Sequence, residues 1–109
     1  MGMEIKRFDV FLISLDPTQG SEIQKTRPCL VVSPDEMNQY LHTIIIAPMT
    51  SRCREYPTRI PCHQGGKEGE IVLDQLRTVD RGRLIKKLGS LDDRTRRAVL
   101  HGLAELFAP

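Results

Sequence analysis

The polar segment Asp16–Arg27 ends in the first side chain that could do chemistry. The guanidinium of Arg27 presents a fork of N–H donors that matches the oxygens of a phosphate, and it does not lose its charge in proteins. Pro28 follows and disfavours helical backbone at Arg27, so this residue is expected in an extended geometry at the exit of the loop. A polar connection of this length inside a small domain is usually functional or mobile. The loop is therefore the first candidate for a site.

Two further groups of polar side chains follow apolar runs. Thr50 and Ser51 come at the end of a run that contains three consecutive isoleucines, and a second group follows Leu73. Hydroxyl and amide groups on loops commonly hydrogen-bond phosphate, sugar or base edges. We therefore group three separated segments, all at strand ends, as one possible site: Ser21, Glu22 and Arg27; Thr50 and Ser51; Asp74, Gln75 and Arg77.

The dominant period of the apolar residues is two, which predicts strands that position these groups. The expected strands are Phe8–Ser14, Cys29–Ser33, His42–Pro48, Thr58–Cys62, Glu70–Leu73, Leu76–Val79 and Ile85–Leu88. Ser33 as N-cap, Pro34 as first helical residue and Glu36 in a capping box predict a short helix that runs to Gln39 or Tyr40. We thus expect a closed β core with one short connecting helix.

A terminal helix is predicted after Ser90 or Asp92 as cap. Its apolar residues recur at helical spacing and are expected on one buried face: Val99, Leu100, Leu103, Leu106 and Phe107. The histidines His42, His63 and His101 are expected at the surface, so a pair of catalytic imidazoles is not predicted.

Length and composition predict one folded domain over residues 1–109. The net charge of +2 permits an anionic partner without requiring one, and the basic loop residues are equally well explained by solubility. No apolar stretch is long enough to span a bilayer, and no signal segment is seen at the N-terminus.

The cysteines are odd in number and irregularly spaced, which favours a reducing compartment, and we expect the cytoplasm. Cys29 is expected to be a small core residue. Cys53, Cys62 and His63 lack the spacing of a zinc site, and no metal is predicted.

The amino-acid sequences of the three segments closely resemble those of the MazF/PemK (Kid) family of toxin endoribonucleases. The likeness extends from about Lys6 into the terminal helix, and the opening residues 7–10 resemble the first strand of that family. The matching motifs are Gly20-Ser21-Glu22 with Thr26-Arg27-Pro28, Ala47-Pro48-Met49-Thr50-Ser51, and Leu73-Asp74-Gln75-Leu76-Arg77-Thr78-Val79-Asp80. They occur in order and at sensible spacing, and together they are specific where each alone would be weak.

The resemblance implies a mainly β fold, an SH3-like small barrel of the CcdB/PemK type with a C-terminal α-helix. It implies a homodimer that cleaves single-stranded RNA, usually mRNA, in short sequence contexts and without a metal or other cofactor. In that family the ribose 2′-hydroxyl attacks the adjacent phosphate and leaves a cyclic phosphate and a 5′-hydroxyl. A cognate antitoxin, with a flexible acidic and apolar tail, covers the RNA groove.

The resemblance also implies roles for individual residues. Arg27 stabilises the phosphorane and assists proton donation, and the Thr50 hydroxyl bonds a nonbridging oxygen. Glu22 matches an acidic position that some members use in activity. The Kid-like subgroup instead uses an aspartate that aligns with Asp74, but its accompanying arginine is replaced here by Val72. The general base therefore stays open between the two carboxylates.

Substrate binding is expected from further polar residues of the three motifs, namely Ser21, Ser51, Asp74, Gln75 and Arg77. Kid-like members have a histidine where Ser21 stands. Tyr40 and Tyr56 are the candidates for stacking on bases, with packing an equal alternative for Tyr56. The competing functions are a noncatalytic CcdB-like toxin that binds gyrase and an RNA-binding barrel without turnover.

Overall fold

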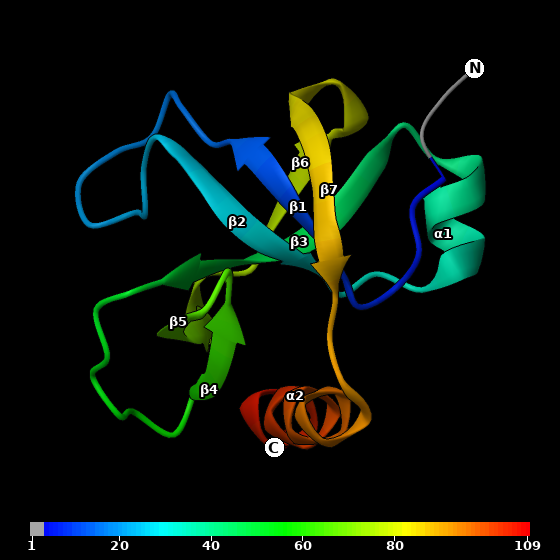
Figure 1. The fold of residues 1–109 in the computed structure, drawn as a ribbon. Coiled ribbons are helices and arrows are strands. Elements are labelled where there is room, and N and C mark those ends of the chain that lie inside the picture. Colours follow the sequence, from blue (N-terminus) through cyan, green and yellow to red (C-terminus); the bar gives the residue numbers. More distant parts are fainter. Residues whose placement is uncertain (1–3) are drawn as a thin grey trace.

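Strands are the main secondary structure of the molecule and form one curled antiparallel sheet (Figure 1). The computed structural model describes residues 4–109. The strands are β1 (Asp9–Ser14), β2 (Thr26–Val31), β3 (Thr43–Thr50), β4 (Arg59–Gln64), β5 (Lys67–Val72), β6 (Arg77–Asp80) and β7 (Leu84–Ser90). They pair in the order β4-β5-β3-β2-β1-β7, and β6 also pairs with β3.

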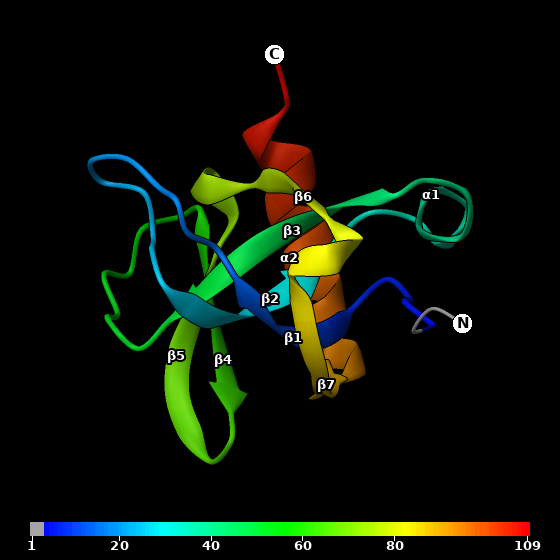
Figure 2. The ribbon, with the colours of Figure 1, turned by 90° about the horizontal axis from the view of Figure 1, so that it is seen from above.

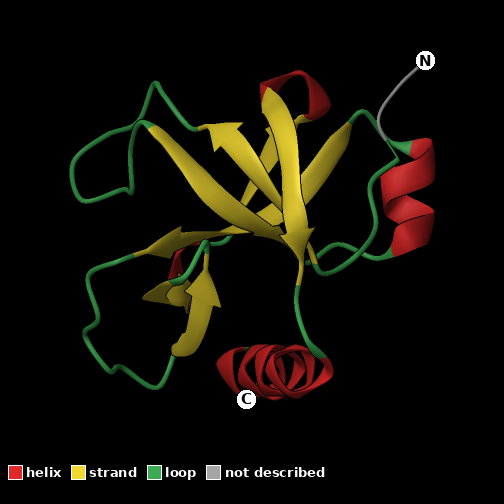
Figure 3. Ribbon diagram, viewed as in Figure 1, coloured by secondary structure: helices red, strands yellow, loops and turns green. Residues whose placement is uncertain are grey.

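The helices lie outside this sheet (Figure 3). α1 (Asp35–Tyr40) connects β2 to β3, and the 3₁₀ turns η1 (Leu73–Gln75) and η2 (Arg81–Arg83) flank β6. α2 (Asp93–Leu106) ends the chain and packs on β4 and η1. The mainly β fold with a connecting helix and a C-terminal helix is confirmed. No helix within residues 4–109 has the length and apolar character needed to cross a membrane.

β3 is the strand that both parts of the sheet share. Its first half pairs with β6, through Thr43↔Asp80 to Ile46↔Arg77, and its middle pairs with β2. Its last two residues pair with β5 instead, through Met49↔Ile71 and Thr50↔Glu70. The β4–β5 hairpin therefore projects from the barrel as a separate arm that is joined at the end of β3 (Figure 2).

Alternating residues of β1 and β2 fill two hydrophobic clusters on opposite faces of the sheet, as period-two side chains must. Val10 and Leu30 face α2 and pack in one cluster with its residue Val99. Phe11, Ile13 and other side chains fill the second cluster inside the curl, which comprises Ile5, Phe11, Ile13, Leu15, Cys29, Val31, Ile44, Ile46, Val79 and Leu84. Cys29 is fully buried there, which confirms its predicted place in the core.

Several predicted element ends differ from the observed ones, and those of β2, β3 and α1 have a clear structural reason. β2 begins at Thr26 and not at Cys29, because residues 26 and 27 already pair with β1 through Ser14↔Thr26 and Ile13↔Arg27. β3 extends past Pro48 to Thr50, because β5 continues the pairing. The N-cap of α1 is Pro34 and not Ser33.

Ser33 does not cap α1 as predicted, and its hydroxyl makes other hydrogen bonds. Its hydroxyl donates to Asn38 Oδ1 and accepts from the Ile45 backbone N–H at 3.1 Å. Ser33 and Asn38 are both buried, so this pair ties α1 to the start of β3 in place of a cap.

The expected closed core and the expected face of the terminal helix need correction. Within residues 4–109 strand pairing ends at β4, β6 and β7, so the sheet is a curled half-barrel. Val99 is fully buried on α2, but Leu100 is 44% exposed and Phe107 is 71% exposed, because both lie beside the face that packs on β4 and η1. The three histidines are exposed, as predicted.

Candidate functional site

A cavity of about 390 Å³ lies between the β1–β2 loop, residues 15–25, and η1. Five of the eight predicted site residues line it: Ser21, Glu22, Asp74, Gln75 and Arg77. Ile23, Pro48 and Leu76 complete the lining. The structure therefore brings residues of two of the three matched motifs together, with Pro48 from the third. Arg27, Thr50 and Ser51 are not part of this lining.

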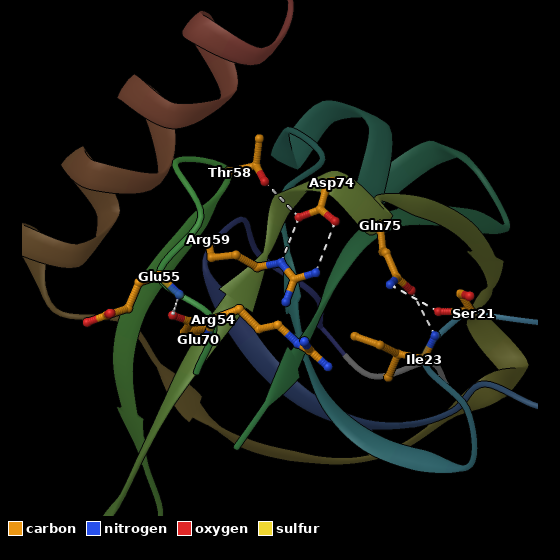
Figure 4. A network of polar contacts seen from close by, with 9 residues as sticks. All are labelled: Ser21, Ile23, Arg54, Glu55, Thr58, Arg59, Glu70, Asp74 and Gln75. Carbon is orange, nitrogen blue, oxygen red and sulfur yellow. Dashed lines mark hydrogen bonds and ion pairs between the residues drawn. The ribbon is translucent and has the colours of Figure 1, made fainter. Parts of the chain in front are cut away.

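Gln75 connects η1 to the β1–β2 loop. Its Oε1 accepts a hydrogen bond from the Ile23 backbone N–H at 2.7 Å, and its Nε2 donates to the Ser21 carbonyl oxygen at 3.3 Å (Figure 4). Both ends of the amide thus hold main-chain groups of the loop. Gln75 determines the position of Ser21 in the cavity wall.

Asp74 is held by two residues that the sequence reasoning did not include. Arg59 Nε lies 2.8 Å from Asp74 Oδ1 and Nη2 lies 3.2 Å from Oδ2, and the Thr58 hydroxyl donates to Oδ1 at 2.9 Å. The hydrogen bonds from Arg59 are the main cause that holds the pKa of the Asp74 carboxyl below its ordinary value of 3.8. Asp74 is therefore an ionised acceptor at neutral pH and a weak base.

Arg59 also explains the replacement noted at Val72. Arg59 stands directly opposite Val72 in the β4–β5 ladder. The guanidinium beside Asp74 thus comes from the neighbouring strand, at the position across from Val72. Only the pairing register reveals this contact, because 15 residues separate Arg59 from Asp74 in the sequence.

Arg27 and Arg77 place their positive charges near one buried thiol. Burial raises the pKa of Cys29 to about 12, and the charges of Arg77 and Arg27 oppose part of that rise. Arg77 donates to the Leu15 carbonyl oxygen at 3.1 Å, and Arg27 Nε donates to the Gln24 carbonyl oxygen at 3.2 Å. Both arginines thus use one guanidinium N–H to hold a main-chain carbonyl oxygen at an end of the β1–β2 loop.

Arg27 and Thr50 occupy the same end of neighbouring strands. The β2–β3 ladder ends at the pair Cys29↔Pro48; Arg27 lies two residues before Cys29 on β2, and Thr50 lies two residues after Pro48 on β3. Thr50 Oγ1 accepts the Arg52 backbone N–H at 3.1 Å, and a hydroxyl that accepts one bond still has its proton to donate.

Glu22 and Ser51 are surface residues of their loops. Glu22 Oε1 accepts the Gln19 backbone N–H at 2.6 Å, and the Glu22 N–H donates to the Gln19 carbonyl oxygen at 3.1 Å. This turn holds the carboxylate at the rim of the cavity. Ser51 is exposed just beyond the end of β3.

A second, larger cavity of about 890 Å³ lies between the β4–β5 hairpin and α2. Cys53, Cys62 and His63 are among its lining residues. In the part of the chain that the structure describes, no three His, Cys, Asp or Glu side chains are grouped so that they could hold a metal ion.

Known proteins with similar sequences and folds are toxins and endoribonucleases. A curated relative, the endoribonuclease MazF of Staphylococcus saprophyticus, is 36% identical over 101 residues, which cover 87% of this chain and 84% of that protein. The crystal structure of MazF from Deinococcus radiodurans matches with a TM-score of 0.83 at 27% identity, over 95% of this chain and 96% of the other.

A mycobacterial endoribonuclease solved in complex with its cognate antitoxin has the same fold, with a TM-score of 0.82 at 21% identity over 96% of this chain and 97% of that one. The family model described as the PemK-like, MazF-like toxin of type II toxin-antitoxin systems matches residues 6–107. The chain therefore belongs to the PemK-like, MazF-like toxin family.

Proposed function

We propose that this chain is an endoribonuclease that cleaves single-stranded RNA through attack of a ribose 2′-hydroxyl on the adjacent phosphate. The supporting observation is that Arg27 and Thr50 both lie two residues beyond the Cys29↔Pro48 pair, at the same end of the β2–β3 ladder. Arg77 lies in the wall of the smaller cavity and adds a cation there. A relative of 36% identity that is named an endoribonuclease supports the same activity.

In the proposed reaction the 2′-oxygen forms a bond to phosphorus while the bond from phosphorus to the 5′-oxygen breaks. The proton of the 2′-hydroxyl goes to a base, and a proton is supplied to the leaving 5′-oxygen. Arg27 neutralises the growing negative charge with its fork of donors and assists protonation of the leaving oxygen, and Thr50 donates to a nonbridging oxygen. The products are a 2′,3′-cyclic phosphate and a 5′-hydroxyl.

Glu22 is the proposed general base. Glu22 and Asp74 are the carboxylates in the wall of the smaller cavity. Arg59 holds the pKa of Asp74 low, which weakens Asp74 as a proton acceptor. Among the described residues, the Glu22 carboxylate accepts a hydrogen bond from the Gln19 backbone N–H and has no cation beside it, and it lies in the wall of the cavity. Ser21, Ser51 and Arg77 would then contact the RNA backbone or bases.

The proposal includes three properties of the assembled system. The toxin acts as a homodimer in the cytoplasm, and a cognate antitoxin with an acidic and apolar tail neutralises it. Exposed apolar side chains, including Ile85, Leu100 and Phe107, offer surface that a second chain or an antitoxin would cover. Mass measurement in solution at micromolar concentration tests the dimer, and a strict monomer would contradict it.

The activity is tested by incubating purified protein with a long unstructured RNA in EDTA and sequencing the new ends. We expect cyclic-phosphate ends that are lost in Arg27→Ala and retained in Arg97→Ala, which removes an exposed arginine of α2. Intact RNA across varied sequences would overturn the proposal. In that case, RNA binding would indicate an RNA-binding barrel without turnover, and its absence would favour a CcdB-like protein binder.

A further inference from the structure

We propose that Glu70 is a positioning residue that fixes the β3–β4 loop, residues 51–58, for RNA recognition beside Thr50; this inference rests on the proposed function. Glu70 lies on β5 and is only 2% exposed. Its Oε1 accepts the Arg54 backbone N–H at 2.9 Å, and its Oε2 accepts the Glu55 backbone N–H at 2.9 Å (Figure 4). A buried carboxylate thus uses both oxygens to hold two successive amides of a surface loop.

The backbone of Glu55 has a strained conformation that these hydrogen bonds stabilise. Its φ of 58° lies in the left-handed region, which residues with a Cβ rarely adopt. Two charge-assisted hydrogen bonds to a buried carboxylate offset this strain, because bonds to an ionised acceptor are stronger than those between neutral groups. The loop therefore has one conformation imposed on it from β5.

Glu70 is also the residue paired with Thr50 across β3 and β5. The carboxylate that holds the loop therefore stands in the same register position as the proposed catalytic hydroxyl. Gly69 lets these strands approach closely, since a Cβ at Gly69 would lie 2.6 Å from the Thr50 carbonyl oxygen. A substitution at Glu70 that releases the loop therefore changes the backbone next to Thr50.

The other end of the loop is held by Asp74, through the Thr58 hydroxyl and the Arg59 guanidinium. Arg59 in turn lies over the ring of Tyr56, 5.2 Å from its centroid, and Tyr56 is half exposed. In Figure 4 the Arg54 side chain extends to the side on which Ser21 and Gln75 lie. A fixed loop thus presents a cation and an aromatic ring beside the reaction site.

From this arrangement we infer that Glu70 sets which bases are accepted next to the scissile phosphate, without contacting RNA itself. An aromatic face and a guanidinium are the groups that proteins use to stack unpaired RNA bases. Their selectivity requires that the loop keep one shape, because a mobile loop accommodates more than one base. Glu70 acts through the main chain of Arg54 and Glu55.

The test is Glu70→Gln, in which one acceptor oxygen becomes an NH₂ group that opposes a backbone N–H. Glu68→Gln is the matched control, since Glu68 is an exposed residue of the same strand. Hydrogen exchange in Glu70→Gln should be about tenfold faster at the Arg54 and Glu55 amides, with core amides such as that of Ile46 unchanged. The control should match wild type.

Cleavage by Glu70→Gln should retain its chemistry and lose selectivity. We expect kcat/KM on the preferred RNA to fall about tenfold, mainly through KM, and the sequenced ends to show a broader set of cut sites. A general loss of folding would instead lower activity without new cut sites. If the Gln variant does not fold, Glu70→Asp, which keeps both oxygens on a shorter stem, should give smaller changes in the same two measurements.

Unchanged exchange at Arg54 and Glu55, or faster exchange with an unaltered set of cut sites, would overturn the role of Glu70 while RNA cleavage by wild type stands. Wild-type protein that leaves RNA intact would overturn the proposed function, and with it the role of Glu70 in recognition. The exchange measurement needs no RNA, so the two failures are distinguishable.

Discussion

Arg59 of β4 and Asp74 of η1 form a fork-to-fork ion pair, with Nε to Oδ1 at 2.8 Å and Nη2 to Oδ2 at 3.2 Å. This pair joins the end of the β3–β4 loop to the wall of the smaller cavity. Because a guanidinium already matches this carboxylate, we propose that Asp74 stabilises the site and that it is not the general base.

Replacing Asp74 with Asn should lower the free energy of unfolding at about pH 7 by less than about 1 kcal/mol, because the pair is partly open to solvent. The lowered pKa of Asp74 means that its contribution is present above the ordinary value of 3.8 and is lost as the pH falls through the lowered pKa. Urea unfolding should therefore separate wild type from Asp74→Asn at neutral pH and bring them together in strong acid. A difference that persists in strong acid would contradict the ion-pair explanation.

Thr50→Val should reduce kcat about 100-fold, the effect typical of removing one donor to a developing oxyanion. Valine keeps the shape of the side chain and cannot donate to phosphate. Thr50→Ser, which retains the hydroxyl, is the control and should stay within a few-fold of wild type. Single-turnover cleavage at saturating RNA measures the effect, and equal rates for Val and Ser would exclude a role for the hydroxyl.

Gly69→Ala should destabilise the protein by about 1–3 kcal/mol, because a Cβ there would lie 2.6 Å from the Thr50 carbonyl oxygen, which is backbone and cannot rotate away. Gly102→Ala on α2 is the contrast. Its Cβ would meet the side-chain ends of Leu73 and Ile60, which can adjust, and alanine favours the helix. Thermal unfolding of both variants checks the order, and a larger loss at Gly102 would show that the strand contact is easily relieved.

Gln75→Glu should raise KM for RNA several-fold and leave stability nearly unchanged. The carboxylate still accepts the Ile23 N–H but has no donor for the Ser21 carbonyl oxygen, so the β1–β2 loop loses one attachment. Gln39→Glu, an exposed residue of α1, makes the same charge change away from the site. An equal rise in KM in both variants would indicate simple repulsion of RNA by the added charge.

Thiol labelling of the native protein should modify Cys53 first among its three cysteines. Cys53 is exposed, whereas burial raises the pKa of Cys29 to about 12 and that of Cys62 to about 11. The thiolate is the reactive form, so the two buried thiols should react only after unfolding. Mass spectrometry of peptides after brief alkylation at about pH 8 measures this, and early modification of Cys29 would show that its cluster opens.

The strands could be predicted because their signals are local, and the cavity wall could be predicted because its residues lie at strand ends in motifs that resemble one family. Period-two patterns gave β1 and β3, and the order of the motifs placed Ser21, Gln75 and their neighbours together. The contacts that orient the site could not be predicted, because they depend on pairing register. Arg59 reaches Asp74 only because β4 pairs with β5. Nothing in the sequence near Glu70 indicates that its carboxylate is buried under the β3–β4 loop.

The errors at element ends have the same origin. The predicted boundaries at Cys29 and Pro48 stand beside or at prolines, which are normally poor strand residues. Partner strands on the other side, β1 for Thr26 and β5 for Thr50, continue the structure beyond each proline. Leu100 and Phe107 fit a helical spacing but lie beside the face that α2 buries, a distinction that only the packing partner decides.

Because β3 is common to the barrel and to the projecting arm, Thr50 is the point at which the two meet. A molecule that tilts the β4–β5 hairpin relative to the barrel must also turn the backbone of Thr50, even if it touches neither Thr50 nor Arg27. A molecule bound to the hairpin can therefore shift the proposed phosphate-binding hydroxyl of Thr50, and it would inhibit cleavage without covering the smaller cavity.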